Sequence, residues 1–191
     1  MSSLPEILSP DGPLAKAIGG YRVREQQVER AERIAAAINS QSVFIAEAGT
    51  GTGKTFAYLV PALKSGGKVI VSTGTKTLQD QLFNKDLPMV RDALKAPVKI
   101  ALLKGRANYV CPYHLQNALA EGRFLTREDA ADARRISNFA KTTQSGDKAE
   151  CIEVSETSPV WNHATSTREN CLGQDCPNYK ECFVMLARRE A

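Results

Sequence analysis

Hydrophobic and polar positions follow two different rhythms along the first half of the chain. Apolar side chains recur every three or four positions over residues 24–39, with Glu and Arg between them, which predicts an amphipathic helix. Three short apolar runs, at 43–46, 69–72 and 98–103, have the length and the branched side chains of buried strands. Helical patterns separate these runs, so we expect an α/β fold in which helices cover both faces of a parallel sheet.

The helical patterns between the apolar runs cover about residues 56–64, 77–85 and 89–94. Pro61 should bend or shorten the first of these helices, because proline removes a helix hydrogen bond. Residues 1–20 contain several prolines and glycines, and we expect them to form an irregular lead-in.

The chain changes character after about residue 104. It becomes more polar, contains all five cysteines, and has one clear helical pattern, from about 126 to 142. Residues 143–170 are rich in Ser, Thr, Asn, Asp and Glu, so they can bury little apolar surface and would gain from a metal that ties them together. We therefore expect three parts: the lead-in at 1–20, the first part of an α/β domain at 21–104, and a mainly helical, metal-binding domain at 105–191.

The overall composition is that of an ordinary soluble globular protein. Of the 191 residues 42% are hydrophobic and 24% are charged, and the net charge of +4 permits a polyanionic partner without requiring one. No apolar run reaches the roughly 18 residues of a membrane span, and the N-terminus lacks the features of a secretory signal. We therefore expect a cytoplasmic protein without membrane contact, whose cysteines serve metal or redox chemistry rather than disulfides.

Residues 48–55 have the pattern of a phosphate-binding loop, with Ala48 in place of its first glycine. Glycines permit positive φ angles and leave room beside the backbone, so that successive N–H groups can surround a phosphate. Lys54 would reach the β- and γ-phosphates, and the Thr55 hydroxyl would ligate Mg²⁺. A flexible Gly/Thr linker is the less favoured interpretation, because an apolar run precedes the loop and a helical pattern follows it. The expected nucleotide-binding positions are Ala48, Gly49, Thr50, Gly51, Thr52, Gly53, Lys54 and Thr55, of which Lys54 and Thr55 would act in catalysis.

The cysteines suggest a metal site. Cys171, Cys176 and Cys182 are spaced C-x₄-C-x₅-C, and Cys111 lies far upstream. Thiolates are soft ligands that select zinc or iron–sulfur clusters. Zinc sites usually contain two close cysteine pairs, whereas one distant and three clustered thiolates also suit a [4Fe–4S] cluster with one iron per cysteine. The spacing favours neither metal, and free thiols are a third, less favoured interpretation. Cys151 lies among alternating apolar residues and is expected to be a packed thiol.

Four motifs follow one another along the chain. They are Glu-Ala-Gly-Thr-Gly-Thr-Gly-Lys-Thr (47–55), Ser-Thr-Gly-Thr-Lys-Thr-Leu-Gln-Asp-Gln-Leu (72–82), Leu-Lys-Gly-Arg-Ala-Asn-Tyr-Val-Cys-Pro (103–112) and Asn-Cys-Leu-Gly-Gln-Asp-Cys-Pro-Asn-Tyr-Lys-Glu-Cys-Phe (170–183). In this order and at these spacings they resemble the DinG/XPD-like iron–sulfur helicases of superfamily 2. The resemblance implies a RecA-like phosphate-loop sheet flanked by helices, here incomplete, with an inserted, mainly helical iron–sulfur cluster domain.

The resemblance also implies roles for single residues. The family's alanine-first loop matches residues 48–55, and its adenine-recognising glutamine matches Gln27, which follows Arg24. A glutamine amide can donate to and accept from one adenine edge, although without the resemblance Gln27 would be interpreted as a solvated helix residue. The implied cofactors are ATP, Mg²⁺ and a [4Fe–4S] cluster, with Cys111, Cys171, Cys176 and Cys182 as the cluster ligands.

DNA contacts are expected in two places. The family's motif that contacts the DNA backbone matches residues 72–81, where Ser72, Thr73, Thr75 and Gln81 could reach phosphates. Basic and aromatic side chains around Cys111, among them Arg106 and Tyr109, suit a groove for single-stranded DNA. By contrast, the arginines of 127–135 alternate with acidic residues, as on an ordinary solvated helix face.

The resemblance as a whole implies an ATP-dependent DNA helicase, working 5′→3′ on single-stranded or forked DNA in repair or replication. Its partners would be repair or replication proteins. The enzyme would lie at the nucleoid in the cytoplasm, and we expect it to be a monomer. The chain contains no Asp-Glu-Ala-His sequence and no second motor domain, so we expect it to be the N-terminal part of a longer protein that does not hydrolyse ATP by itself. The alternative is a phosphate-loop nucleotide-binding module with a structural zinc site and no translocation activity.

Overall fold

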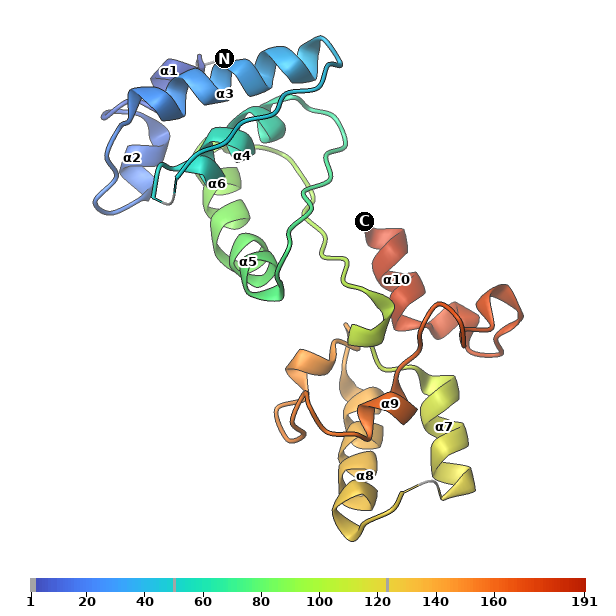
Figure 1. Cartoon of the computed structure of the whole chain (residues 1–191). Helices are drawn as coiled ribbons and strands as arrows, with labels where there is room; N and C mark the ends of the chain where they lie inside the picture. The colour runs from blue at the N-terminus through green and yellow to red at the C-terminus, as the bar shows by residue number, and fades with distance from the viewer. Residues whose placement is uncertain (1–2, 50, 123) are drawn as a thin grey trace. The chain divides into compact units, whose positions relative to one another are not determined.

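The computed structural model describes residues 3–49, 51–122 and 124–191, which form two compact units, Met1–Ile100 and Ala101–Ala191 (Figure 1). Helices make up the regular structure of both units, and the described residues contain no β-strand. None of the helices in this part of the chain combines the length and the apolar character that crossing a membrane requires.

The predicted parallel sheet is wrong for this structure. The apolar runs at 43–46, 69–72 and 98–103 have no regular secondary structure, so the RecA-like α/β arrangement is not formed by the described residues. Val43 and Ile45 are 89% and 90% exposed, the opposite of a buried strand. A strand requires a neighbour for its N–H and C=O groups and a layer over its face, and an apolar run cannot show whether either is present.

The first unit is a helical cluster in which α3 and α4 make the most extensive contact. The lead-in expected to be irregular is partly helical, and it contributes Leu8 and Leu14 to the core, both 0% exposed. Pro61 lies inside α4 without ending it. The helices of this unit are α1 (Leu4–Ile7), α2 (Pro13–Ala17), α3 (Glu25–Asn39), α4 (Lys54–Lys64), α5 (Lys76–Gln81), a π-helical turn (Leu82–Asp86) and α6 (Leu87–Leu94).

The second unit packs its own core around Trp161 and Ile136, which are 3% and 0% exposed. Thr126 begins α8 with a capping box, in which it exchanges hydrogen bonds with Asp129, and this explains why the helix starts where the pattern predicts. The unit consists of α7 (Pro112–Glu121), α8 (Arg127–Thr142), α9 (Trp161–Ala164), α10 (Phe183–Glu190) and 3₁₀ turns at Arg106–Asn108, Lys148–Glu150, Gly173–Asp175 and Tyr179–Glu181.

Candidate functional site

The glycine-rich loop leads directly into the first turn of α4. Gly51 and Gly53 have φ angles of 74° and 76°, a left-handed conformation that glycine adopts at little cost. Gly53 is the N-cap of α4, which begins at Lys54, so the unpaired N–H groups of the helix end face the loop. Thr50, one of the expected nucleotide-binding residues, lies outside the described residues.

Two side chains of the loop donate hydrogen bonds to the loop's own backbone. The Thr52 hydroxyl donates to the Gly49 carbonyl oxygen at 3.0 Å, and Lys54 Nζ donates to the Ala48 carbonyl oxygen at 2.7 Å. The Lys54 ammonium group therefore lies on a neutral acceptor at the opposite end of the loop. A phosphate in the loop would offer it a charged acceptor, and charge-assisted hydrogen bonds are roughly twice as strong as neutral ones.

Arg24 and Gln27 hold the loop from the start of α3. Arg24 Nη1 donates to the Gly51 carbonyl oxygen, and Gln27 Nε2 donates to the Gly53 carbonyl oxygen at 2.9 Å. Gln27 is only 2% exposed, and its Oε1 accepts from the Tyr21 hydroxyl at 3.2 Å. Both ends of the glutamine amide are thus engaged, so Gln27 supports the loop in this structure and is not a solvated helix residue.

The Thr55 hydroxyl and the buried carboxylate of Asp86, which the sequence did not single out, both affect Tyr58. Burial raises the pKa of Tyr58, a hydrogen bond from the Thr55 hydroxyl lowers it, and the charge of Asp86 raises it further. Asp86 is 5% exposed, and its Oδ2 accepts from Gln81 Nε2 at 2.9 Å. The sequence signal that could have identified Asp86 is a charged residue among the apolar positions of a helix. This hydrogen bond places the side chain of Gln81, an expected DNA contact, against the Asp86 carboxylate.

The other expected DNA contacts of the first unit gather before α5. Thr75 is the N-cap of α5, where its Oγ1 accepts from the Leu78 N–H at 3.3 Å, and the Thr73 hydroxyl donates to the Thr75 carbonyl oxygen at 3.2 Å. Ser72 precedes them and is exposed. The structure therefore brings these three hydroxyl residues into one accessible turn at the start of a short helix.

A cavity of about 440 Å³ adjoins the loop between α3 and residues 44–49. Arg30 lines this cavity, and its Nη1 is buried without a hydrogen-bond partner among the described residues. Arg33 lines it as well and is paired with Glu29 at 2.7 Å. The first unit thus has cationic side chains and open volume beside its glycine-rich loop.

In the second unit, Cys111, Cys171, Cys176 and Cys182 line one pocket of about 220 Å³. Cys111 is the N-cap of α7, and Cys182 is the N-cap of α10. Thiolates are favoured at helix N-termini, where the helix dipole is positive. The other two cysteines flank the 3₁₀ turn Gly173–Asp175. The structure therefore gathers the four cysteines that the resemblance named, and Cys151, at 4% exposed, packs in the core instead.

The pocket contains donors suited to sulfur anions. Arg106 Nη1 donates to Cys171 Sγ at 2.8 Å, and the Gly173 N–H donates to the same sulfur at 3.4 Å. Burial raises the pKa of the Cys111 thiol, and the neighbouring charges of Cys182 and Cys176 raise it further. Thiolates this close repel one another, so the full set of four requires a positively charged group among them.

These side chains are not gathered around a single ion position. Within the described ranges, no group of three or more His, Cys, Asp or Glu residues could hold one metal ion. A [4Fe–4S] cluster differs from a zinc ion because it presents a separate iron to each cysteine. The four cysteines that line one pocket are a soft donor set of the kind that binds zinc or an iron–sulfur cluster.

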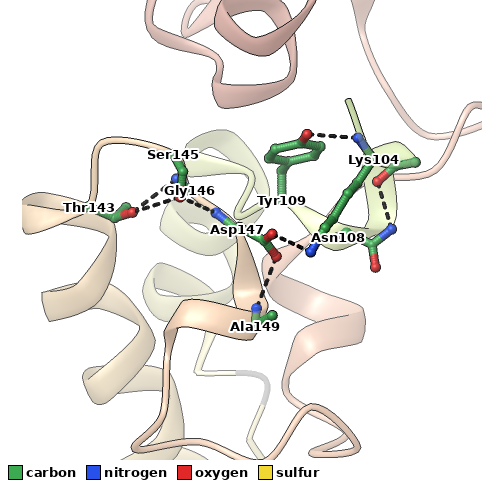
Figure 2. Close-up of polar contacts among 9 residues, drawn as sticks. Lys104, Asn108, Tyr109, Thr143, Ser145, Gly146, Asp147 and Ala149 are labelled. Atoms are coloured by element: carbon green, nitrogen blue, oxygen red, sulfur yellow. Dashed lines mark hydrogen bonds and ion pairs between the residues drawn. The ribbon is translucent and has the colours of Figure 1, made fainter. Parts of the chain in front are cut away.

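Tyr109, expected to stack on DNA bases, is instead a core residue. Its side chain is 4% exposed, and its hydroxyl accepts from the Lys104 N–H at 2.9 Å (Figure 2). A ring buried to this degree presents no free face for a base in this structure. Arg106, the other candidate beside Cys111, is directed at the cysteine pocket.

Comparison with known proteins relates the chain to helicases. Residues 28–110 match the DEAD/DEAH box helicase family. The chain is 49% identical over 190 residues to "ATP-dependent DNA helicase YoaA" of Haemophilus influenzae, with 100% of this chain and 30% of that protein covered. It is 48% identical over 188 residues to YoaA of Escherichia coli, covering 98% of this chain and 30% of the relative. With "ATP-dependent helicase DinG" of Mycobacterium tuberculosis the identity is 36% over 211 residues, covering 99% of this chain and 31% of the relative.

The chain spans about 30% of the length of these curated relatives. Its matches to them cover both units, including the glycine-rich loop of the first and the cysteine pocket of the second. Residues 28–110 thus match the DEAD/DEAH box helicase family, and the chain is similar to YoaA and DinG along nearly its whole length.

Proposed function

We propose that this chain is the ATP-binding and iron–sulfur portion of an ATP-dependent DNA helicase. The observation that carries the proposal is the 49% identity to a protein named as such a helicase, extending across the whole chain. The proposed enzyme moves 5′→3′ along single-stranded or forked DNA as a monomer, together with replication or repair proteins. An activity on DNA would place it at the nucleoid in the cytoplasm.

ATP would bind at residues 48–55 with its phosphates against the N-terminus of α4. In the loop, the Lys54 ammonium group would exchange the Ala48 carbonyl oxygen for phosphate oxygens. The Thr55 hydroxyl would ligate the Mg²⁺ ion that accompanies the nucleotide. Arg24 and Gln27, which already hold the loop carbonyls, would keep its N–H groups directed inward.

The cluster would be held by Cys111, Cys171, Cys176 and Cys182, the cysteines that line one pocket. When bound, it would supply iron–sulfur bonds that join the segment around Cys111 to the segment 171–182, and so brace a polar unit. Arg106 would offset part of the negative charge of the four thiolates through its hydrogen bond to Cys171.

DNA would contact the accessible turn that contains Ser72, Thr73 and Thr75. Hydroxyl groups at such a turn can bind phosphate oxygens without reading the base sequence. We expect no ATP turnover from the 191 residues by themselves, because the acidic residues that orient the attacking water are not among them.

The test is ATP hydrolysis by the protein produced from the full reading frame that encodes this chain. Single-stranded DNA should stimulate hydrolysis, and Lys54→Ala should reduce the stimulated rate by at least about 100-fold, in the range seen when a catalytic electrostatic contact is removed. Lys64→Ala, at the other end of α4, is the matched control and should retain activity. Hydrolysis that is indifferent both to DNA and to Lys54→Ala would overturn the proposed function.

A further inference from the structure

The turn at residues 143–149, called here the clamp turn, follows α8 and contacts two segments that adjoin cysteines of the pocket. Figure 2 shows the polar contacts of this turn. One segment ends at Cys111 and the other begins at Cys182. Neither segment is near the clamp turn in sequence, and no residue of the turn lines the cysteine pocket itself. Its contacts nevertheless bear on where those two sulfur atoms lie.

The first set of contacts is with the segment that leads to Cys111. Asp147 pairs with Tyr109 in an antiparallel bridge, and the Val110 N–H donates to the Gly146 carbonyl oxygen at 2.8 Å. Asp147 Oδ2 forms an ion pair with Lys104 Nζ at 2.7 Å, and the two side chains are 9% and 5% exposed. A paired, buried charge of this kind is costly to break on one side, because the remaining charge is left buried without compensation.

The second contact is with the segment that begins at Cys182. Gly146 has a φ angle of 68°, and its backbone lies directly against Phe183, the residue after Cys182. A Cβ atom added at Gly146 would lie 2.2 Å from Phe183 Cγ. This position therefore excludes every residue but glycine, both by its backbone conformation and by the space available.

The clamp turn is itself held by three local hydrogen bonds. The Gly146 N–H donates to Thr143 Oγ1, the Asp147 N–H to Ser145 Oγ and the Ala149 N–H to Asp147 Oδ1, each at 3.0 Å. These contacts fix the turn independently of the cysteines. The turn can therefore fix the positions of both neighbouring segments.

We propose that the clamp turn positions Cys111 and Cys182 for the cluster, with Gly146 and Asp147 as positioning residues. The inference rests on the proposed cluster. Three of the four cysteines are close in sequence, whereas Cys111 must be brought to them by packing. The clamp turn is the element that joins the backbone next to Cys111 to the side chain next to Cys182. Residues that orient ligands in this way typically change metal affinity by about 10–100-fold when altered.

The experiment compares Gly146→Ala with Gly122→Ala in the whole chain. Gly122 also has a positive φ angle, 63°, but nothing lies within 4 Å of an added Cβ atom, so this control carries the same backbone strain without the contact to Phe183. After anaerobic reconstitution with iron and sulfide, Gly146→Ala should lose iron to a chelator about tenfold faster than Gly122→Ala. Trp161 fluorescence reports in parallel whether the core of the unit remains folded, since this indole is 3% exposed.

Asp147→Asn provides a second, milder variant. It retains the size of the side chain but replaces the carboxylate that pairs with Lys104 by a neutral amide, so iron loss should again be accelerated while Trp161 stays buried. Iron loss at the wild-type rate in both variants would overturn the inference, and so would unfolding of the unit without iron, which would show a general role in folding. A wild-type chain that takes up no iron would instead contradict the proposed cluster, and the clamp role would fall with it.

Discussion

The guanidinium group of Arg106 donates a hydrogen bond to the sulfur of Cys171, with 2.8 Å between Nη1 and Sγ. A positive charge this close to a cluster ligand would favour the more negatively charged, reduced state of the cluster. The contact joins residues that are far apart in sequence, and it places Arg106, an expected DNA contact, at the cysteine pocket.

Arg106→Met should therefore shift the reduction potential of the cluster to a more negative value. The measurement is a redox titration of the reconstituted chain, followed by absorbance. Arg189→Met, which removes the same charge from an exposed position of α10, should leave the potential close to that of the wild type. Equal shifts in both variants would show that only net charge matters and not the hydrogen bond to Cys171.

Gly53→Ala should weaken binding of an ATP analogue in the presence of Mg²⁺. The left-handed conformation costs a residue with a Cβ atom about 1–2 kcal/mol, and the new atom would lie 2.3 Å from Gln27 Nε2. We expect an increase of at least about tenfold in Kd, because about 1.4 kcal/mol corresponds to that factor. Isothermal titration calorimetry would measure it.

Gly66→Ala is the matched control for this loop variant, since Gly66 has a φ angle of 70° and nothing within 4 Å of an added Cβ atom. It should bind the analogue like the wild type. Wild-type affinity of Gly53→Ala would mean that the contact between Gln27 and the loop does not matter for nucleotide binding.

The stability of the second unit should fall as the pH rises above the ordinary thiol value. Burial raises the pKa of Cys151 above 9.0, and the charge of Glu153 raises it further. In the folded state the Cys151 thiol therefore keeps its proton at a pH where the thiol of the unfolded chain has lost it. The free energy of unfolding decreases as the pH rises through this range. Unfolding in urea, followed by Trp161 fluorescence without metal at about pH 7.5 and pH 9.5, would measure the change.

Cys151→Ala should make that pH dependence shallower, whatever its effect on stability at neutral pH. The comparison isolates the thiol because the substitution leaves the other titrating groups in place. An unchanged slope in the variant would assign the pH dependence to groups other than Cys151.

The helices that the sequence predicted well are those whose signals are local. The helix expected at 24–39 is observed as Glu25–Asn39, and the one expected from 126 to 142 as Arg127–Thr142. Apolar spacing and a capping residue such as Thr126 act within a few residues of the chain. The strands depend on partners elsewhere in the chain, and an apolar run such as 43–46 contains no information about whether a partner is present.

The site was predictable to the extent that a motif contained it. The glycine-rich loop could be recognised from consecutive residues, and its positive φ angles at Gly51 and Gly53 fit that interpretation. The ion pair of Lys104 with Asp147 could not be recognised in this way, because it depends on which segments pack together. Tyr109 lies beside a motif, but its burial depends on packing that the motif does not encode.

The central claim, that the second unit holds a cluster within an ATP-driven DNA helicase, is tested most directly by the metal content. Iron, acid-labile sulfide and zinc should be measured on the chain purified without oxygen, beside Cys171→Ser and Cys151→Ala. We expect about four irons and four sulfides per chain in the wild type and in Cys151→Ala, and their loss in Cys171→Ser. One zinc without iron, or equal iron in all three proteins, would contradict it.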